Sequence, residues 1–310
     1  MSNLYLGMDL GTSGARVSIV DACGQSKAMG AARLDGARMR DPDEWWRAVK
    51  AAMFQALADV STGDVCAVAV SATSGTVLAV GEDDRPTGQV FMYSDLCPDA
   101  VVLQNIRQKA PDWSPARGGT GGLGCALTLA RSGVHRVAHQ ADWINFKLCG
   151  AWRGDSSSAL KSGYDIVAES WPAWVAELGL VSGKRSDIAA CGTKMGQLSP
   201  KICDQFGFRR DVTLVAGTTD GCASFLATGA DEIGDAVTVL GTTLTVKLLS
   251  GKPVFDASVG VYSHQVEGKW LVGGASNSGG GVLLDHFPMD DLTAVSAKID
   301  GTKGIAKLIF

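Results

Sequence analysis

Three patterns are missing from this chain of 310 residues, and each absence excludes a class of protein. Gly, Asp or Ser interrupts every apolar run well short of a membrane span, and no signal peptide opens the chain. No cluster of Lys and Arg offers a surface to nucleic acid or membrane, and the net charge is -4. The eight cysteines include no CxxC pair, which in a chain this long is typical of reduced thiols in the cytosol. The sequence therefore predicts a soluble cytoplasmic protein, and its length favours two domains.

One short motif is present twice. Residues 10–20 (LGTSGARVSIV) and 240–250 (LGTTLTVKLLS) each place a Leu-Gly-Thr turn between apolar flanks, which predicts a strand, a tight turn and a returning strand. Glycine lets the backbone approach a ligand, and exposed amides and hydroxyls offer donors to an anion. Two such turns predict a site that holds a polyphosphate between them. Asp9 precedes only the first copy, with Val239 at the equivalent position of the second, so the first turn is expected to handle the cation of a metal-bound nucleotide.

The order of predicted elements indicates two α/β domains around a cleft, where ligands commonly bind. The first third predicts β-β-β-α-β order, with a helix starting at Asp41-Pro42 because Asp caps helix N-termini and Pro suits the first turn. A boundary near Arg210-Asp211 divides the chain into residues 1–210 and 211–310. Strands are expected at 4–9, 16–21, 65–71, 76–80, 212–216, 236–240, 243–249, 260–265 and 270–274, and helices from 41, at 96–109, 222–229 and 279–287.

Asp220 is the sharpest candidate for a catalytic residue. It follows the apolar run at 212–216, where a helix is expected to begin. An aspartate at a strand-to-helix junction in a cleft can accept the proton of a substrate hydroxyl, as phosphoryl transfer to an alcohol requires. The alternative is an ordinary helix N-cap, which Asp also suits. The Gly-Thr turns upstream and downstream favour the catalytic interpretation.

At this point the sequence resembles a known family, the FGGY carbohydrate kinases. The matching motifs occur in the family's order, and the closest resemblance is to the branch of D-ribulose kinases and D-xylulose kinases. The resemblance implies an actin/hexokinase-like fold of two ribonuclease-H-like domains, which uses ATP and Mg²⁺ to phosphorylate the terminal hydroxyl of a sugar. The motifs are residues 9–13 (DLGTS), 72–78 (ATSGTVL), 140–143 (QADW), 159–165 (ALKSGYD), 216–221 (AGTTDG), 241–243 (GTT), 261–264 (VYSH) and 273–277 (GGASN).

The resemblance assigns roles to individual residues. Asp220 is expected to be the catalytic base, and Asp9 to hold the metal through water. On the first side of the nucleotide, the phosphate-binding residues are expected to be Gly11, Thr12, Ser13 and Arg16. On the second side, the expected contacts are Gly241, Thr242, Gly274 and Ser278.

Residues of the first domain are expected to bind the sugar. Xylulokinases typically have Met-His-Gly where this chain has Ser74-Gly75-Thr76, and this departure favours D-ribulose over D-xylulose as the substrate. Asp95 falls where the family often places an acidic or amide group toward sugar hydroxyls; its alternative role is helix capping. Trp143 is expected to form the floor of the sugar site, although an aromatic residue at helical spacing is also typical of a core. His135 and His139 lie four residues apart without a third ligand, which indicates a structural pair rather than a zinc site.

The family usually continues well past the point where this chain ends, with a segment that closes over the adenine. We therefore expect a truncated second domain, with exposed apolar surface that favours homo-oligomers. Two hypotheses remain open: a sugar kinase, for D-ribulose or alternatively D-xylulose, and a non-catalytic remnant that binds sugar or nucleotide. A small-molecule sugar is the expected partner in both cases.

Overall fold

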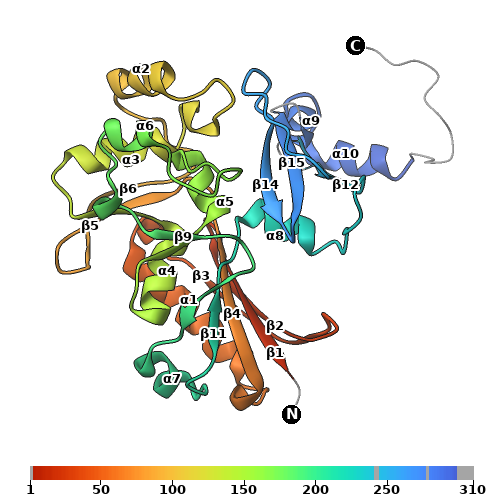
Figure 1. The fold of residues 1–310 in the computed structure, drawn as a ribbon. Coiled ribbons are helices and arrows are strands. Elements are labelled where there is room, and N and C mark those ends of the chain that lie inside the picture. Colours follow the sequence, from red (N-terminus) through yellow and green to blue (C-terminus); the bar gives the residue numbers. More distant parts are fainter. Residues whose placement is uncertain (1–2, 241–243, 277–278, 299–310) are drawn as a thin grey trace.

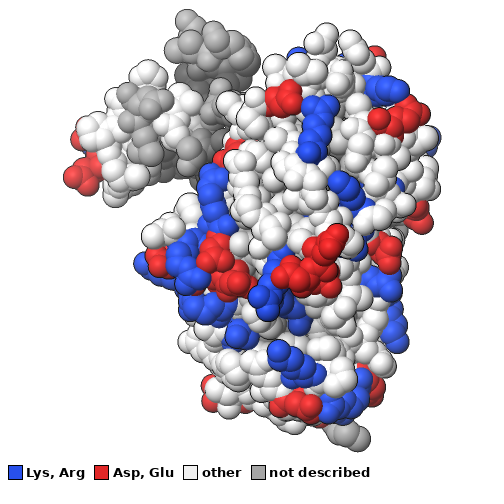
Figure 2. All heavy atoms as spheres, turned by 90° about the vertical axis from the view of Figure 1, so that its left-hand side faces the viewer, with Lys and Arg blue, Asp and Glu red and all other residues white. Residues whose placement is uncertain are grey.

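The computed structural model describes residues 3–240, 244–276 and 279–298. Figure 1 shows a larger body, built from the first two thirds of the chain, beside a smaller one that contains β12–β15 and α8–α10. No helix in these three ranges is long and apolar enough to cross a membrane. On the face seen in Figure 2, basic and acidic side chains are interspersed.

The larger body contains a six-stranded sheet in the order β10-β11-β4-β1-β2-β3. Strands β1 to β3 form an antiparallel meander, while β1 and β4, and β4 and β11, run parallel. Burial alternates along β1, because its even-numbered residues enter the core. The strands are β1 (Leu4–Leu10), β2 (Gly14–Asp21), β3 (Ser26–Arg33), β4 (Val65–Ala72), β10 (Lys194–Gln197) and β11 (Thr213–Val215).

Helix α1 (Pro42–Leu57) packs on β2 and β3. Asp41 caps it as the sequence predicts, accepting a hydrogen bond from the Asp43 amide, and Trp45, Val49 and Met53 are fully buried. The helix lies so close to β3 that a Cβ on Gly30 would come within 2.1 Å of the Ala52 carbonyl oxygen. The β-β-β-α-β order predicted for the first third is therefore present.

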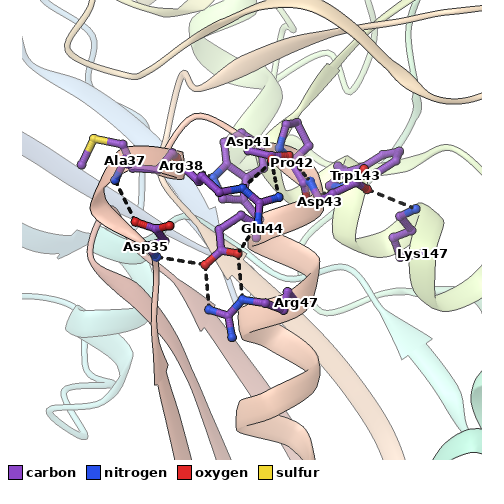
Figure 3. Close-up of polar contacts among 12 residues, drawn as sticks. Asp35, Ala37, Arg38, Asp41, Pro42, Asp43, Glu44, Arg47, Trp143 and Lys147 are labelled. Carbon is purple, nitrogen blue, oxygen red and sulfur yellow. Dashed lines mark hydrogen bonds and ion pairs between the residues drawn. The ribbon is translucent and has the colours of Figure 1, made fainter.

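A buried carboxylate anchors the first turn of α1 (Figure 3). Glu44 accepts hydrogen bonds from Arg47 Nε and Nη2, both at 2.7 Å, and from the Asp35 amide at 2.9 Å. The hydrogen bonds from Arg47 and then from the Asp35 amide lower the pKa of Glu44 to about 2. The buried charge is thus fully compensated, which a lone carboxylate in this position would not be.

The rest of the larger body surrounds a second core around β5 and α3. Its strands form a three-stranded sheet in the order β6-β5-β7 and a parallel pair, β8 with β9. The strands are β5 (Val77–Val80), β6 (Pro86–Phe91), β7 (Arg136–His139), β8 (Arg153–Asp155) and β9 (Asp187–Ala189). The helices are α2 (Ala100–Lys109), α3 (Gly122–Arg131), α4 (Gln140–Cys149), α5 (Ser156–Ala159), α6 (Ala173–Glu177) and α7 (Pro200–Phe206), with a short 3-10 helix, η4 (Leu160–Ser162), after α5.

The smaller body is a four-stranded antiparallel sheet in the order β12-β13-β15-β14. Helix α8 packs its buried Cys222 and Phe225 against Leu249, Val266 and Leu271 of the sheet. The elements are β12 (Ala236–Leu240), β13 (Leu244–Ser250), β14 (Tyr262–Val266), β15 (Lys269–Ser276), α8 (Asp220–Leu226), α9 (Gly280–His286) and α10 (Met289–Ser296).

The predicted boundary near Arg210-Asp211 assigns the strand expected at 212–216 to the second domain, but the structure places it in the first. It is β11, which pairs with β4 inside the first sheet. The first sheet therefore includes residues beyond 210, and the second sheet begins only at Ala236. A short apolar run carries no signal of which sheet it joins, because both neighbours are distant in sequence.

Candidate active site

Strand β4 aligns the two aspartates that the sequence singles out. Asp9, at the end of β1, lies opposite Ser71 of β4, and the next β4 residue, Ala72, forms a parallel bridge with Thr219. Asp220 follows Thr219 and begins α8, with its carboxylate exposed and accepting a hydrogen bond from the Gly221 amide. Two residues 211 positions apart thus flank the same end of β4.

The two carboxylates influence each other electrostatically. Burial raises the pKa of Asp9, the charge of Asp220 raises it further, and Arg16, whose Nη1 lies 3.5 Å from Asp9 Oδ2, acts in the opposite direction. Next to Asp9, the hydroxyls of Ser71 and Thr218 are buried without a hydrogen-bond partner among the described residues. Paired carboxylates and free hydroxyls are the hard oxygen donors that suit Mg²⁺ and its water shell. The residues present therefore fit a hydrated magnesium ion.

The first Leu-Gly-Thr turn is closed by backbone hydrogen bonds. The Gly11 amide donates to Gly14, and the Leu34 amide donates to Ser13. Thr12 and Ser13 are exposed, and together with Arg16 they border a hollow of about 700 Å³. The turn thus presents two hydroxyls and one guanidinium to solvent on the same edge of the sheet as Asp9.

The second side of the predicted nucleotide site is only partly described. Gly241, Thr242 and Ser278 lie outside the described residues, so the facing of the two turns stays a prediction. Gly274 lies in β15 opposite Val246 and lines an apolar hollow of about 370 Å³.

In the predicted sugar segment, the backbone conformation of Gly75 is tied to α3, whereas the hydroxyl of Ser74 has no hydrogen-bond partner among the described residues. Gly75 adopts φ +94°, which favours glycine, and its carbonyl accepts a hydrogen bond from the Gly122 amide. The Thr76 hydroxyl is fully buried and accepts a hydrogen bond from the Tyr93 amide at 3.0 Å. The Ser74 hydroxyl has no partner among the described residues. Of the two neighbouring hydroxyls, only the one at Ser74 is available to a ligand.

Asp95 is engaged within the protein. Arg40 donates to both of its carboxylate oxygens, and the Met92 amide donates to Oδ2 at 2.8 Å. The hydrogen bond from Arg40 holds the pKa of Asp95 below its usual range. This carboxylate therefore positions the turn after β6, and its contact with a sugar stays a prediction.

Trp143 is a core residue, and its predicted place in the floor of the sugar site is wrong. The side chain is fully buried in the main core, where it packs near Phe146 and Trp152. Its indole N–H donates to the Pro42 carbonyl at 2.8 Å, and Lys147 lies over the ring (Figure 3). Helical spacing of apolar residues around Trp143 indicates burial, and here that interpretation holds.

His139 has a structural role, as the sequence predicts. Its Nδ1 lies 3.0 Å from Asp142 Oδ2, its Nε2 lies 2.9 Å from Ser162 Oγ, and all three side chains are buried. His135 is exposed, and the described residues contain no group of three metal-ligating side chains. The His139 network ties β7 and α4 to η4, the turn that carries Lys161.

Four residues around Asp220 receive no role from the sequence: Lys161, Cys222, Lys247 and His264. Lys161 lies within electrostatic range of Asp220, Tyr93 and Cys222. Lys247 Nζ, on β13, lies 3.6 Å from Cys222 Sγ. Burial alone would raise the pKa of Cys222, but His264, Lys247 and Thr219 lower it to about 6. Lys161 and His264 stand in the motifs at 159–165 and 261–264, and Lys247 interrupts the apolar strand 243–249, so the sequence held a signal for these three.

Comparison with known proteins shows which family the first part of the chain is similar to. Residues 4–112 match the N-terminal domain of the FGGY family of carbohydrate kinases. A xylulose kinase of Haemophilus influenzae is 21% identical to this chain over 284 residues, which cover 82% of this chain and 57% of the relative. The xylulose kinase of Escherichia coli is 23% identical over 291 residues, covering 86% and 59%.

A third relative, a gluconokinase of Bacillus subtilis, is 30% identical to this chain over 115 residues, covering 36% of this chain and 22% of the relative. The chain thus spans less than three fifths of the length of the two xylulose kinases.

Solved structures confirm the predicted actin/hexokinase-like fold of this chain. A xylulose kinase from Rhodospirillum rubrum superposes with a TM-score of 0.82 at 16% identity, covering 96% of this chain and 68% of that one. A gluconate kinase from Lactobacillus acidophilus gives a TM-score of 0.78 at 18% identity, covering 96% and 66%.

Proposed function

We propose that the chain is the sugar-binding part, with a portion of the nucleotide-binding part, of a kinase that transfers the γ-phosphoryl group of ATP to a ketopentose. D-ribulose is the proposed substrate and D-ribulose 5-phosphate the product. The observation that carries the proposal is the alignment of Asp9 and Asp220 by β4. The relatives named xylulose kinase and gluconokinase support the sugar-kinase class.

In the proposed reaction, the Asp220 carboxylate accepts the proton of the terminal hydroxyl of the sugar. The sugar oxygen then forms a bond to the γ-phosphorus of ATP as the bond from that phosphorus to the bridging oxygen breaks, and ADP leaves. Asp220 suits this role because its carboxylate is exposed and keeps one oxygen free of the Gly221 amide. General-base catalysis of this kind requires direct contact with the hydroxyl.

Asp9 would hold Mg²⁺ through water, and Thr12, Ser13 and Arg16 would bind the phosphates from the first turn. The metal supplies charge compensation for the phosphoryl group. Arg16 keeps the phosphates near the sheet edge, because a guanidinium donates several hydrogen bonds in a fixed geometry. Ser74 would donate to or accept from a sugar hydroxyl.

The choice of D-ribulose over D-xylulose rests on Ser74-Gly75-Thr76, where xylulokinases typically have Met-His-Gly. The two sugars differ in configuration at one carbon, and a hydrogen-bonding site can discriminate strongly between such isomers. Ser74 provides the one free hydroxyl of that segment.

Measurement of ADP formation with a panel of ketopentoses tests the proposal, with calorimetry of each sugar in the absence of ATP as a companion. The kinase hypothesis predicts sugar-dependent ADP formation that is highest with D-ribulose. Sugar binding without ADP formation would favour the alternative, a chain that binds sugar but does not catalyse transfer. Equal or faster turnover of D-xylulose would overturn the choice of substrate.

A further inference from the structure

Two lysines approach Asp220 from the two bodies of the molecule. Lys161 belongs to η4 of the larger body, directly after α5, and α5 contacts β14 of the smaller body. Lys247 belongs to β13 of the smaller body. Both lysines lie near Cys222, since Lys161 interacts electrostatically with Asp220 and Cys222, and Lys247 donates to Cys222 Sγ. We call Lys161 and Lys247 the lysine pair.

Neither member of the lysine pair forms an ion pair with a carboxylate within the ranges that the structure describes. Both are partly buried. Burial lowers the pKa of Lys161, and Asp220, Tyr93 and Cys222 act in the opposite direction. A lysine held away from solvent without a salt bridge is costly, and such groups cluster at functional sites. Asp220 and the Cys222 thiol are the anionic groups near the pair, and neither is in ion-pair contact with either lysine, so both ammonium groups can still bind an anionic ligand.

Each lysine lies beside a glycine. A Cβ on Gly221, the residue after Asp220, would come within 3.1 Å of Lys247 Nζ. A Cβ on Gly75, in the predicted sugar segment, would come within 3.5 Å of Lys161 Cδ. The lysine pair is therefore adjacent to the proposed base on one side and to the proposed sugar segment on the other.

The surroundings of Lys161 are cationic and hollow. Lys161 lines a hollow of about 410 Å³ at the junction of the two bodies, together with Arg107, Arg117 and Tyr262. Among the described residues that line this hollow there is no carboxylate. Arg117 forms an ion pair with Asp112 outside this lining and donates to the Arg107 and Ala110 carbonyls, so Lys161 and Arg107 are the charges left for a ligand.

Lys161 is also held in place. The adjacent Ser162 hydroxyl bonds to the buried His139 imidazole at 2.9 Å, and a Cβ on Gly122 would come within 2.5 Å of the Lys161 carbonyl oxygen. These contacts fix the backbone at Lys161, so the point from which the side chain extends needs no rearrangement when a ligand binds.

We propose that Lys161 and Lys247 bind the oxygens of the phosphoryl group on the sugar, one from each side of Asp220. This inference rests on the proposed function, because it assigns the anion to the phosphorylated sugar. The lysine pair then favours the phosphoryl group once it reaches the sugar hydroxyl, and bridges the two bodies through the ligand. Charge-assisted hydrogen bonds of about 1.5–3 kcal/mol correspond to roughly 10- to 100-fold in affinity.

Calorimetry without ATP tests this assignment on the full chain, with D-ribulose, D-ribulose 5-phosphate and inorganic phosphate as probes. The variants are Lys161→Met and Lys247→Met, with Lys252→Met as the matched control because Lys252 is exposed on the loop after β13. Lys161→Arg and Lys247→Arg keep the charge and report on folding. We expect wild type to bind the phosphate ester more tightly than D-ribulose. Each Met variant should lose roughly 10-fold or more of that preference, while the control and the Arg variants retain most of it.

Equal affinity of the Met variants and wild type for both phosphate probes would overturn the role of the lysine pair. A loss of D-ribulose affinity as large as the loss for the ester would also overturn it, since the lysines would then act on the sugar itself. If wild type binds inorganic phosphate through the lysine pair but binds neither sugar, the inference about the anion stands and the proposed ketopentose is wrong.

Discussion

At the scale of single residues, the proposed sugar site depends on two neighbouring hydroxyls with opposite situations. The Thr76 hydroxyl forms hydrogen bonds with the Tyr93 amide and the Thr73 hydroxyl, whereas the Ser74 hydroxyl is unpartnered among the described residues. A buried hydroxyl without a partner costs stability unless a ligand uses it. The two residues should therefore separate binding from folding.

Ser74→Ala is expected to weaken D-ribulose binding about 2- to 10-fold, because one hydrogen bond to the ligand is lost. Its free energy of unfolding should stay within about 0.5 kcal/mol of wild type. Thr76→Val should instead lower the free energy of unfolding by about 1–3 kcal/mol, because the Tyr93 amide loses its acceptor. Calorimetry and chemical denaturation measure both quantities. Unchanged D-ribulose affinity in Ser74→Ala would remove this hydroxyl from the site.

Glu44 gives a prediction about stability against pH. Its pKa is lowered to about 2 in the folded chain, so its contribution is fully present above about 4.5 and is lost as the pH falls toward 2. Glu44→Gln should therefore destabilise the chain by about 2–3 kcal/mol at pH 7, and the difference from wild type should shrink steadily below pH 4. Urea denaturation at a series of pH values measures it. A difference that stays constant down to pH 2.5 would contradict the assignment.

The sequence predicted the placement of the two aspartates better than the burial of the side chains around them. Asp9 and Asp220 stand in motifs with Gly and Thr neighbours, and the structure brings them together. For Trp143 the sequence left two roles open, the floor of the sugar site and the core, and the structure shows the core role that its helical spacing indicates. Lys161 and Lys247 were missed because their partial burial arises from contacts between distant segments.

At the scale of elements, the seam between β4 and residues 217–220 decides the geometry of the site. Gly217 packs against β4 so closely that a Cβ would come within 1.9 Å of the Val70 carbonyl oxygen. Only glycine allows this approach, which brings Thr219 to its bridge with Ala72 and sets the start of α8.

Gly217→Ala should push this segment away from β4 and separate Asp220 from Asp9. We expect a loss of at least about 1–3 kcal/mol in the free energy of unfolding, as for overpacking of a tight core, together with lower sugar-dependent ADP formation. Gly196→Ala, in β10 of the same sheet, is the matched control because nothing lies within 4 Å of its added Cβ. Equal behaviour of the two variants in denaturation would show that the seam is not tight.

Long periodic or capped elements were predictable, while the pairing of short ones was not. Asp41-Pro42 and the buried positions of α1 follow from capping chemistry and helical period. The three residues of β11 carry no such signal, and their place in the first sheet depends on β4 and β10, which are distant in sequence.

At the scale of the whole molecule, one buried carboxylate opposes the pH dependence of Glu44. Burial raises the pKa of Asp155 to about 6, although Ser158 donates to it. A raised pKa contributes stability that is present below about 4 and is lost as the pH rises through about 6. Asp155→Asn should keep the hydrogen bond from the Ser158 amide and flatten the loss of stability between pH 4 and pH 6.5. Thermal melts of both proteins across this range measure the effect, and parallel curves would refute it.

The central claim is that Asp220, aligned with Asp9 by β4, is the base that accepts the proton of the sugar hydroxyl. The most direct measurement compares wild type and Asp220→Asn in D-ribulose-dependent ADP formation, with D-ribulose affinity measured on the same samples. We predict a roughly 10²- to 10⁴-fold lower kcat with little change in affinity or folding, since Asn keeps the shape and caps helices equally well. Near-normal turnover in Asp220→Asn would contradict the account and leave Asp220 as a helix-terminal residue without a part in catalysis.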